Sequence, residues 1–309
     1  IALILILSAA LRLFDLGKLP ISLFGDEVDV GYHAWSLFTS LKDYSGRFLP
    51  LYIKSLAEFR APILMYVSAP FVGFFGPSTF SVRLGAAVMG LLSIYLLYYL
   101  VNLIFPKRQL GVVAALFISL TTWHIHYSRA AFEVTTLMAL VLLGAIAFIN
   151  KKYILSSIFF CLTIYTYSTA AVFTPLFVSL LFFTFRPTKI KDLVVPIIVA
   201  IFLITPFLFS LRNGESGSRF SSISIFSDQK VIDSIIIART YPWIISDKFT
   251  VFLHNKPLAF ARTIFDNGLK ARSPNFLFGA GDPEPRHNPG FGLLPLVFLP
   301  LILLGLNRF

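Results

Sequence analysis

The chain has 309 residues, of which 57% are hydrophobic, 16% aromatic and only 13% charged. A soluble domain carries about 25% charged residues, so this composition excludes an ordinary soluble protein and indicates a polytopic membrane protein. The net charge of +11 comes from dispersed basic residues, which is typical of membrane orientation and contact with anionic lipid rather than of nucleic-acid binding. The single cysteine, Cys161, excludes an internal disulfide and a CxxC-type metal site.

Apolar runs that approach the length of a membrane span, about 20 residues, recur along the chain. We expect spans at 1–16, 80–105, 111–127, 133–150, 153–168, 170–185, 193–211 and 291–307. The sequence starts inside an apolar run and stops just after another, so we expect a fragment clipped at both ends, with a shortened first span. No internal repeat or soluble second domain is evident, and residues 1–309 are predicted to form one all-α transmembrane domain.

Residues 62–76 decide the predicted topology. This run is apolar but short for a span, and it contains Pro62, Pro70 and Gly73. If it does not cross the membrane, the basic short loops at 107–108, 151–152 and 186–191 share one face, which the positive-inside rule assigns to the cytoplasm. If it does cross, those basic loops lie outside the cell instead, against the positive-inside rule. We therefore expect an interfacial helix at 62–76 and outer segments at 17–79, 124–133 and 212–290.

The first outer segment contains the most carboxylate-rich stretch of the chain, Phe24-Gly25-Asp26-Glu27-Val28-Asp29. Apolar residues follow at helical spacing, so we predict a helix over residues 26–40 with Asp26 as its N-cap and Tyr32 at headgroup level. Ionisable groups this close to a bilayer usually mark a functional pathway. Asp26 is therefore a candidate general base with Glu27 as a helper, while simple capping by Asp26 is the structural alternative.

A second cluster comprises His124, His126, Arg129 and Glu133. On one continuous helix Arg129 and Glu133 would share a face and pair, with His126 on the same face. Arg129 could bind a phosphate through its planar fork, and Glu133 could position an acceptor. The alternative is a purely structural ion pair between two helix ends. Two histidines spaced two apart make a poor metal site.

The late outer loop, residues 279–290, is rich in Gly and Pro, which favours a fixed lid-like loop. Within it, Asp282, Arg286 and His287 are candidates to contact a donor phosphate or sugar, and a solvated charged turn is the alternative. Arg83, at the outer start of a span, and Arg60 are further phosphate candidates. Equally, these two could extend to lipid headgroups.

Four stretches resemble one known family. They are "FGDEVDVGYHAWSL", "GPSTFSVRLGAAVMGLLSIYLLYYLVNLIF", "WHIHYSRAAFE" and "FLFGAGDPEPRHNPGFGLLP". Their order and their predicted side of the membrane are similar to those of the GT-C glycosyltransferases of the protein O-mannosyltransferase and lipid A aminoarabinose transferase superfamily. Family members are much longer than this chain.

The resemblance implies a GT-C-like helix bundle that transfers sugar from a polyprenyl-phosphate carrier to an acceptor on the extracytoplasmic face of a bacterial or archaeal plasma membrane. It also implies that Asp26 is the catalytic base, that Glu27 is the second acid of the pair, and that Glu133 is a further acid where the aminoarabinose transferases carry Asp. His287 corresponds only to a position in a similar loop. No cofactor is required, and a divalent metal near Asp26 is allowed but not indicated.

A single displacement by a deprotonated acceptor would invert the anomeric centre, because no glycosyl-enzyme intermediate is needed. The acceptor could be a protein, a lipid or a polysaccharide. One competing hypothesis is a transporter or flippase of lipid-linked sugars, but the paired inverted repeats typical of transporters are not found here. The other is a non-catalytic scaffold in a glycan-assembly complex.

Overall fold

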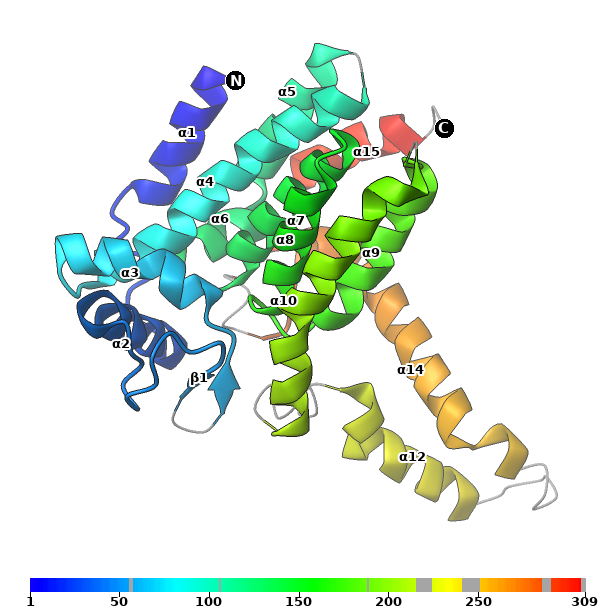
Figure 1. The fold of residues 1–309 in the computed structure, drawn as a ribbon. Helices are drawn as coiled ribbons and strands as arrows, with labels where there is room; N and C mark the ends of the chain where they lie inside the picture. Colours follow the sequence, from blue (N-terminus) through cyan, green and yellow to red (C-terminus); the bar gives the residue numbers. More distant parts are fainter. Residues whose placement is uncertain are drawn as a thin grey trace.

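The described part of the chain folds mainly into α-helices (Figure 1). A computed structural model describes residues 1–55, 58–105, 107–187, 189–214, 224–240, 251–284 and 290–306. Within these ranges the only sheet is a two-stranded antiparallel ribbon, in which β1 (Ile53–Lys54) pairs with β2 (Phe59–Arg60). The predicted all-α membrane class is confirmed.

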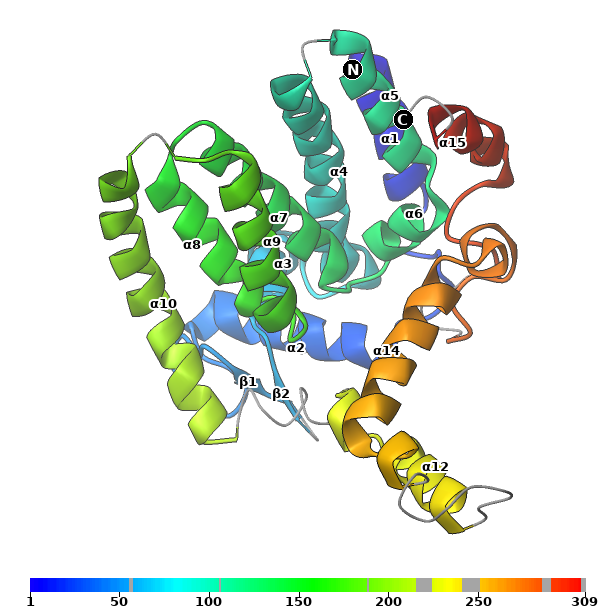
Figure 2. The same cartoon turned by 90° about the vertical axis from the view of Figure 1, so that its right-hand side faces the viewer.

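Seven helices form the body of the bundle: α1 (Ala2–Leu13), α4 (Thr79–Ile104), α5 (Arg108–Leu120), α7 (Val134–Ile149), α8 (Tyr153–Ile164), α9 (Ala170–Thr184) and α10 (Val194–Arg212). Short 3-10 helix η1 (Ile190–Leu193) leads into α10, and α6 (Thr122–Arg129) follows α5. The connections α4–α5, α7–α8 and α9–α10, which hold the basic short loops, all lie at one end of this body (Figure 2).

The opposite end carries the functional segments. There α2 (Gly25–Ser40) lies across the end of the bundle, with α3 (Ile63–Phe75) between it and α4 (Figures 1 and 2). Helices α12 (Gln229–Thr240) and α14 (Lys256–Ala271) form an arm beside it. The remaining short elements are η2 (Ile225–Ser227), the π-helix η3 (Asn275–Gly279), η4 (Leu296–Phe298) and α15 (Leu299–Leu306).

Fewer helices have the full length of a membrane span than the hydropathy pattern predicted. Among the described residues, Thr79–Ile104 and Ile190–Arg212 are long and apolar enough to cross a membrane, and the remaining apolar helices are shorter. The span expected at 111–127 is not one straight helix, because Gln109–Leu120 and Thr122–Arg129 meet at an angle of 62°. The cause lies at Thr121, whose backbone is extended (φ −67°, ψ 122°), so the helical hydrogen-bond ladder is interrupted there.

A tightly packed core joins α2, α3 and α4. Val30 and Leu37 of α2 are buried against Leu64 and Val72 of α3 and against Val82 of α4. Glycines permit this close approach. At Gly85 of α4, for example, an added Cβ would come within 2.6 Å of Ser68 Oγ and 3.1 Å of Ser68 Cα.

We expect Gly85→Val to lower the free energy of unfolding by about 1–3 kcal/mol, because Ser68 meets the new side chain with backbone as well as with its hydroxyl. Thermal unfolding in detergent would measure the change. The matched control is Gly305→Ala, where a helical glycine faces open space and the substitution should be neutral or slightly stabilising. Equal stability of Gly85→Val and the wild type would contradict this view of the α3–α4 contact.

Candidate functional site

The two adjacent carboxylates at the start of α2 have different environments. Helix α2 begins at Gly25, and the Glu27 carboxylate accepts a hydrogen bond from the Phe24 amide at 3.0 Å. Glu27, in the third position of the helix, therefore provides the cap that the sequence pattern assigned to Asp26. Asp26 lies inside the first turn, with its side chain 35% exposed.

Glu27 is buried and forms an ion pair with Arg83 of α4, in which both carboxylate oxygens accept hydrogen bonds. Arg83 Nε donates to Glu27 Oε1 at 2.8 Å and Arg83 Nη2 donates to Glu27 Oε2 at 3.1 Å. The Ala131 amide, before α7, also donates to Oε1 at 3.0 Å. The rest of the guanidinium donates to backbone carbonyls of residues 16, 20 and 22. Arg83 was predicted to contact a phosphate, but it is fully buried, and its guanidinium already forms the ion pair with Glu27 and these hydrogen bonds.

Asp26 pairs instead with Arg60 of β2, at 2.5 Å between Asp26 Oδ1 and Arg60 Nη2. Arg60 is almost fully buried and also contacts Asp29 at 3.3 Å and Glu58 at 3.4 Å. Burial opposes its charge, but Glu133, Asp26, Asp29 and Glu58 outweigh burial and raise the pKa of Arg60. Arg60 is therefore the cation on which the carboxylates of the first outer segment and of the α6–α7 connection converge.

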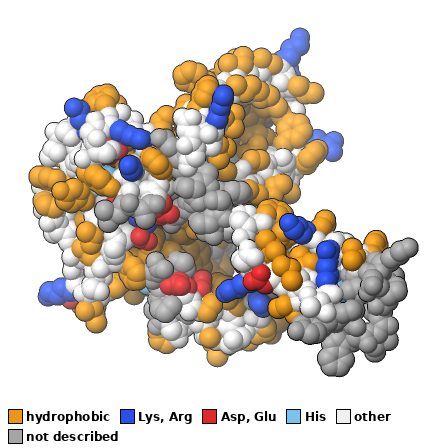
Figure 3. Space-filling view, turned by 90° about the horizontal axis from the view of Figure 1, so that it is seen from below, with side chains coloured by type: hydrophobic (Ala, Val, Ile, Leu, Met, Phe, Trp, Pro, Cys, Tyr) orange, Lys and Arg blue, Asp and Glu red, His pale blue; other side chains and the backbone are white. Residues whose placement is uncertain are grey.

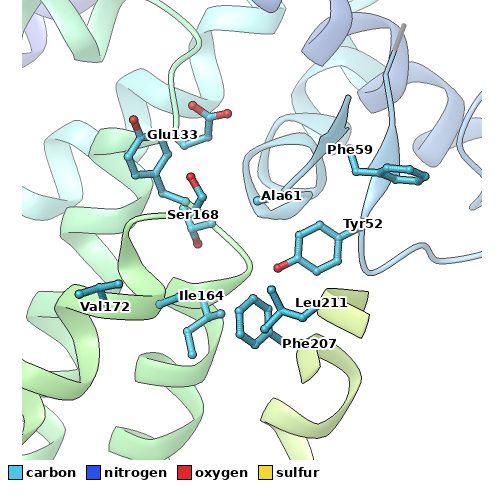
Figure 4. A pocket seen from close by; sticks show the side chains of 12 residues that line it. Tyr52, Phe59, Ala61, Glu133, Ile164, Ser168, Val172, Phe207 and Leu211 are labelled. Carbon is cyan, nitrogen blue, oxygen red and sulfur yellow. The ribbon is translucent and has the colours of Figure 1, made fainter. Parts of the chain in front are cut away.

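Glu133 reaches this cluster from the start of α7, where it is the N-cap residue. It lines a pocket of about 250 Å³ together with Tyr52, Phe59, Tyr167 and Phe207. Figure 4 shows Glu133 and Ser168 on one side of this pocket and Tyr52 on the other. The pocket is mostly apolar, so Glu133 is the charged group on its wall.

Arg129 does not form the predicted pair with Glu133. The chain leaves the helix after Arg129 and α7 starts only at Val134, so the four-residue helical spacing does not exist. Arg129 instead donates to the carbonyl oxygens of Leu11, Phe14 and Leu19 at 2.8–3.1 Å, which secures the end of α1. Sequence spacing alone could not show this break, because apolar residues continue through it.

Of the other predicted binding residues, some lie near Glu133 and others do not. Asp282 and Glu133 both act electrostatically on Tyr127, so the start of the late loop lies close to the Glu133 wall. His126 contacts the Tyr127 ring edge-on, with centroids 5.7 Å apart. Tyr32 is 66% exposed and lines a separate surface hollow with Asp29. The predicted residues Arg286 and His287 lie outside the described residues.

Carboxylates are visible from the α2 end of the molecule (Figure 3). Within the described ranges, however, no group of three or more His, Cys, Asp or Glu side chains has an arrangement that could hold a metal ion.

Arg60 is the site residue that sequence reasoning underrated. Its place two residues after Glu58 in the first outer segment was the available signal, and only the β-ribbon shows that it faces Asp26.

The fold and this cluster define a class: an all-α integral membrane protein that presents a carboxylate–arginine cluster and a small pocket at one end of its helix bundle. Residues 60–209, a little under half of the chain, match the model of the family described as dolichyl-phosphate-mannose-protein mannosyltransferase. This part of the chain is similar to that family, whose members are mannosyltransferase-like membrane glycosyltransferases of the GT-C type that use a lipid-linked sugar. Searches of curated proteins and of solved structures found no match.

The two adjacent carboxylates should differ in their effect on stability. Glu27→Gln leaves the buried Arg83 guanidinium without its counter-charge, and we expect a loss of about 3–5 kcal/mol in the free energy of unfolding. Asp26→Asn removes a partly exposed partner and should cost about 1 kcal/mol or less. Unfolding of both variants in detergent would test this, and a larger loss for Asp26→Asn would contradict it.

His33 of α2 makes stability depend on pH. It is fully buried, stacks on Tyr44 with centroids 4.4 Å apart, and lies 3.5 Å from Asp29 Oδ1. Neither ring nitrogen has a hydrogen-bond partner among the described residues. Burial lowers the pKa of His33, although Asp29 and Asp43 act in the opposite direction. The folded protein therefore keeps this imidazole neutral.

Below pH 6.5 the unfolded chain binds a proton at His33 that the folded protein resists, so stability should fall as the pH drops from 7.5 to 5.5. The contribution of one group is at most about 1.4 kcal/mol per pH unit. His33→Asn removes the titrating group and should flatten this part of the profile. Identical slopes for the variant and the wild type would show that other groups cause the pH dependence.

Proposed function

We propose that this protein transfers a sugar from a polyprenyl-phosphate carrier to an acceptor hydroxyl, with inversion and with Asp26 as general base. The observation that carries the proposal is the partly exposed position of Asp26 in the cluster around Arg60. One carboxylate oxygen contacts Arg60, and no other described polar side chain contacts Asp26. The second oxygen is therefore free to accept a proton.

Arg60 positions this base. Its guanidinium is clamped by Asp29 and Glu58 as well as by Asp26, so the Asp26 side chain is held in one orientation before substrate arrives. A preorganised base avoids the cost of ordering the group during the reaction. Several carboxylates surround this single guanidinium, so the cluster keeps an excess of negative charge.

The pocket beside Glu133 fits the donor sugar. Sites for drug-sized ligands usually have volumes of roughly 300–1,000 Å³, so a pocket of about 250 Å³ suits a single sugar ring rather than an oligosaccharide. Tyr52 and Phe207 supply the apolar walls on which a sugar ring can pack, and Glu133 supplies an acceptor for its hydroxyls. In this arrangement Glu133 binds sugar and Asp26 acts on the acceptor.

The reaction is one displacement. The acceptor oxygen attacks the anomeric carbon from the face opposite the lipid phosphate, while its proton passes to Asp26. The bond between that carbon and the phosphate oxygen breaks, and polyprenyl phosphate leaves with the bonding electrons. A single displacement inverts the anomeric centre. Neither a cofactor nor a metal is needed for this balance.

The family description favours mannose carried on dolichyl phosphate as the donor and a protein as the acceptor. The positive-inside rule supports an extracytoplasmic site, because the basic connections lie at the opposite end of the bundle from α2. Lipid or polysaccharide acceptors would use the same chemistry. The product identified with a panel of polyprenyl-phosphate sugars distinguishes these acceptors.

We expect Asp26→Asn to reduce the rate of sugar transfer by about 10²–10⁴-fold while the protein remains folded and inserted, because the amide cannot accept the proton. Mass spectrometry of glycans formed by the purified protein would measure transfer. Asp266→Asn, on the exposed arm, is the matched control and should retain activity. Full activity in Asp26→Asn would exclude this base. Movement of lipid-linked sugar between leaflets without a glycoside product would instead indicate a flippase.

A further inference from the structure

A second charged hollow lies at the opposite end of the bundle from Asp26. Its volume is about 600 Å³, and Lys151, Lys152 and Lys191 line it together with one acid, Asp192. All three lysines are exposed, and none forms an ion pair with a described residue. This hollow plays no part in the sugar-transfer site.

The lysines come from two separate connections that the fold brings together. Helices α8 and α10 are joined side by side, because Ser157 Oγ donates to the Pro196 carbonyl at 2.9 Å and Tyr165 Oη donates to the Leu203 carbonyl at 2.6 Å. The start of α8 therefore lies beside η1. A general excess of basic residues in short loops would not require two of these loops to share one hollow.

The backbone around Lys151 adds to this arrangement. Lys151 has φ +60°, a conformation that favours glycine, and it closes the end of α7 through hydrogen bonds from the Lys151 and Lys152 amides to Phe148 and Ala147 carbonyls. A lysine is present where glycine would be easier to accommodate. The next helix, α8, starts at this point with no side-chain cap, so the positive end of its dipole faces the same hollow.

An apolar groove continues from the hollow into the membrane region. It has a volume of about 500 Å³, lies between α8, α9 and α10, and includes Phe160, Val178 and Ile197 in its walls. Tyr153 and Pro196 line both the groove and the basic hollow. The basic hollow and the apolar groove are therefore adjacent, because they share these two residues.

We propose that this composite site binds an anionic phospholipid from the leaflet opposite the sugar-transfer site. The headgroup phosphate lies among Lys151, Lys152 and Lys191, and one acyl chain lies in the groove between α8, α9 and α10. Basic pockets between membrane helices recognise such headgroups through charge. The adjoining groove favours a lipid over a free phosphate, because only a lipid occupies both compartments.

Native mass spectrometry of the purified protein tests the headgroup part. The protein is equilibrated in mixed micelles with equal amounts of phosphatidylglycerol and phosphatidylcholine, and the retained lipids are compared. The wild type should prefer phosphatidylglycerol, and each lysine neutralised should lower that preference by about fivefold. Lys151→Gln, Lys152→Gln and Lys191→Gln together should abolish it. A triple control, Lys107→Gln, Lys256→Gln and Lys270→Gln, removes the same charge elsewhere and should retain it.

Two tryptophan variants on α9 test the groove. Ser179 is exposed and lines the groove, so Ser179→Trp should obstruct it and lower phosphatidylglycerol retention severalfold. Leu176→Trp, on the exposed surface of the same helix, should not. The proposal is overturned if the lysine triple variant keeps the wild-type preference, if the control triple loses as much, or if Ser179→Trp retains lipid normally. Displacement of the lipid by inorganic phosphate alone would also overturn it.

Discussion

The buried ion pair between Glu27 and Arg83 is the interaction on which the architecture of the site depends. It connects the start of α2 to α4, and through the Ala131 amide it also holds the connection that leads to Glu133. A buried pair of this kind is costly to break, because either partner alone would be an uncompensated charge. With Glu27 directed into the protein, Asp26 one residue earlier must point along a different direction of the helix, toward Arg60 and solvent.

Arg60 then unites acids that lie far apart in the sequence. Asp26, Asp29 and Glu58 belong to the first outer segment, while Glu133 comes from the start of α7. The four carboxylates would repel one another without the buried guanidinium between them. Their convergence places Asp26 and the pocket-lining Glu133 around the same guanidinium, an arrangement that suits the proposed displacement of a lipid phosphate.

The two ends of the bundle carry opposite electrostatic character, and this polarity matches their proposed tasks. Acidic groups cluster under α2, where a hydroxyl must lose a proton. Lysines gather where α8 and α10 start, beside an apolar groove suited to a lipid chain. The helices between them expose mainly apolar side chains, so the ends can differ chemically while the body remains compatible with the membrane.

Composition and hydropathy alone determined that this is an all-α membrane protein, because burial in lipid constrains every residue of a span and leaves a pattern along the chain. The motifs alone indicated a resemblance to one family. Charge placed beside apolar runs also pointed to Asp26, Glu27 and Glu133 as candidate site residues. Only the tertiary structure decided that Glu27 is the structural acid, that Arg129 secures α1 instead of pairing with Glu133, and that Arg60 holds Asp26. Those outcomes depend on which distant segment packs against each side chain. Spacing along one helix cannot reveal such contacts, since a single extended residue at Thr121 or a short β-ribbon redirects everything that follows.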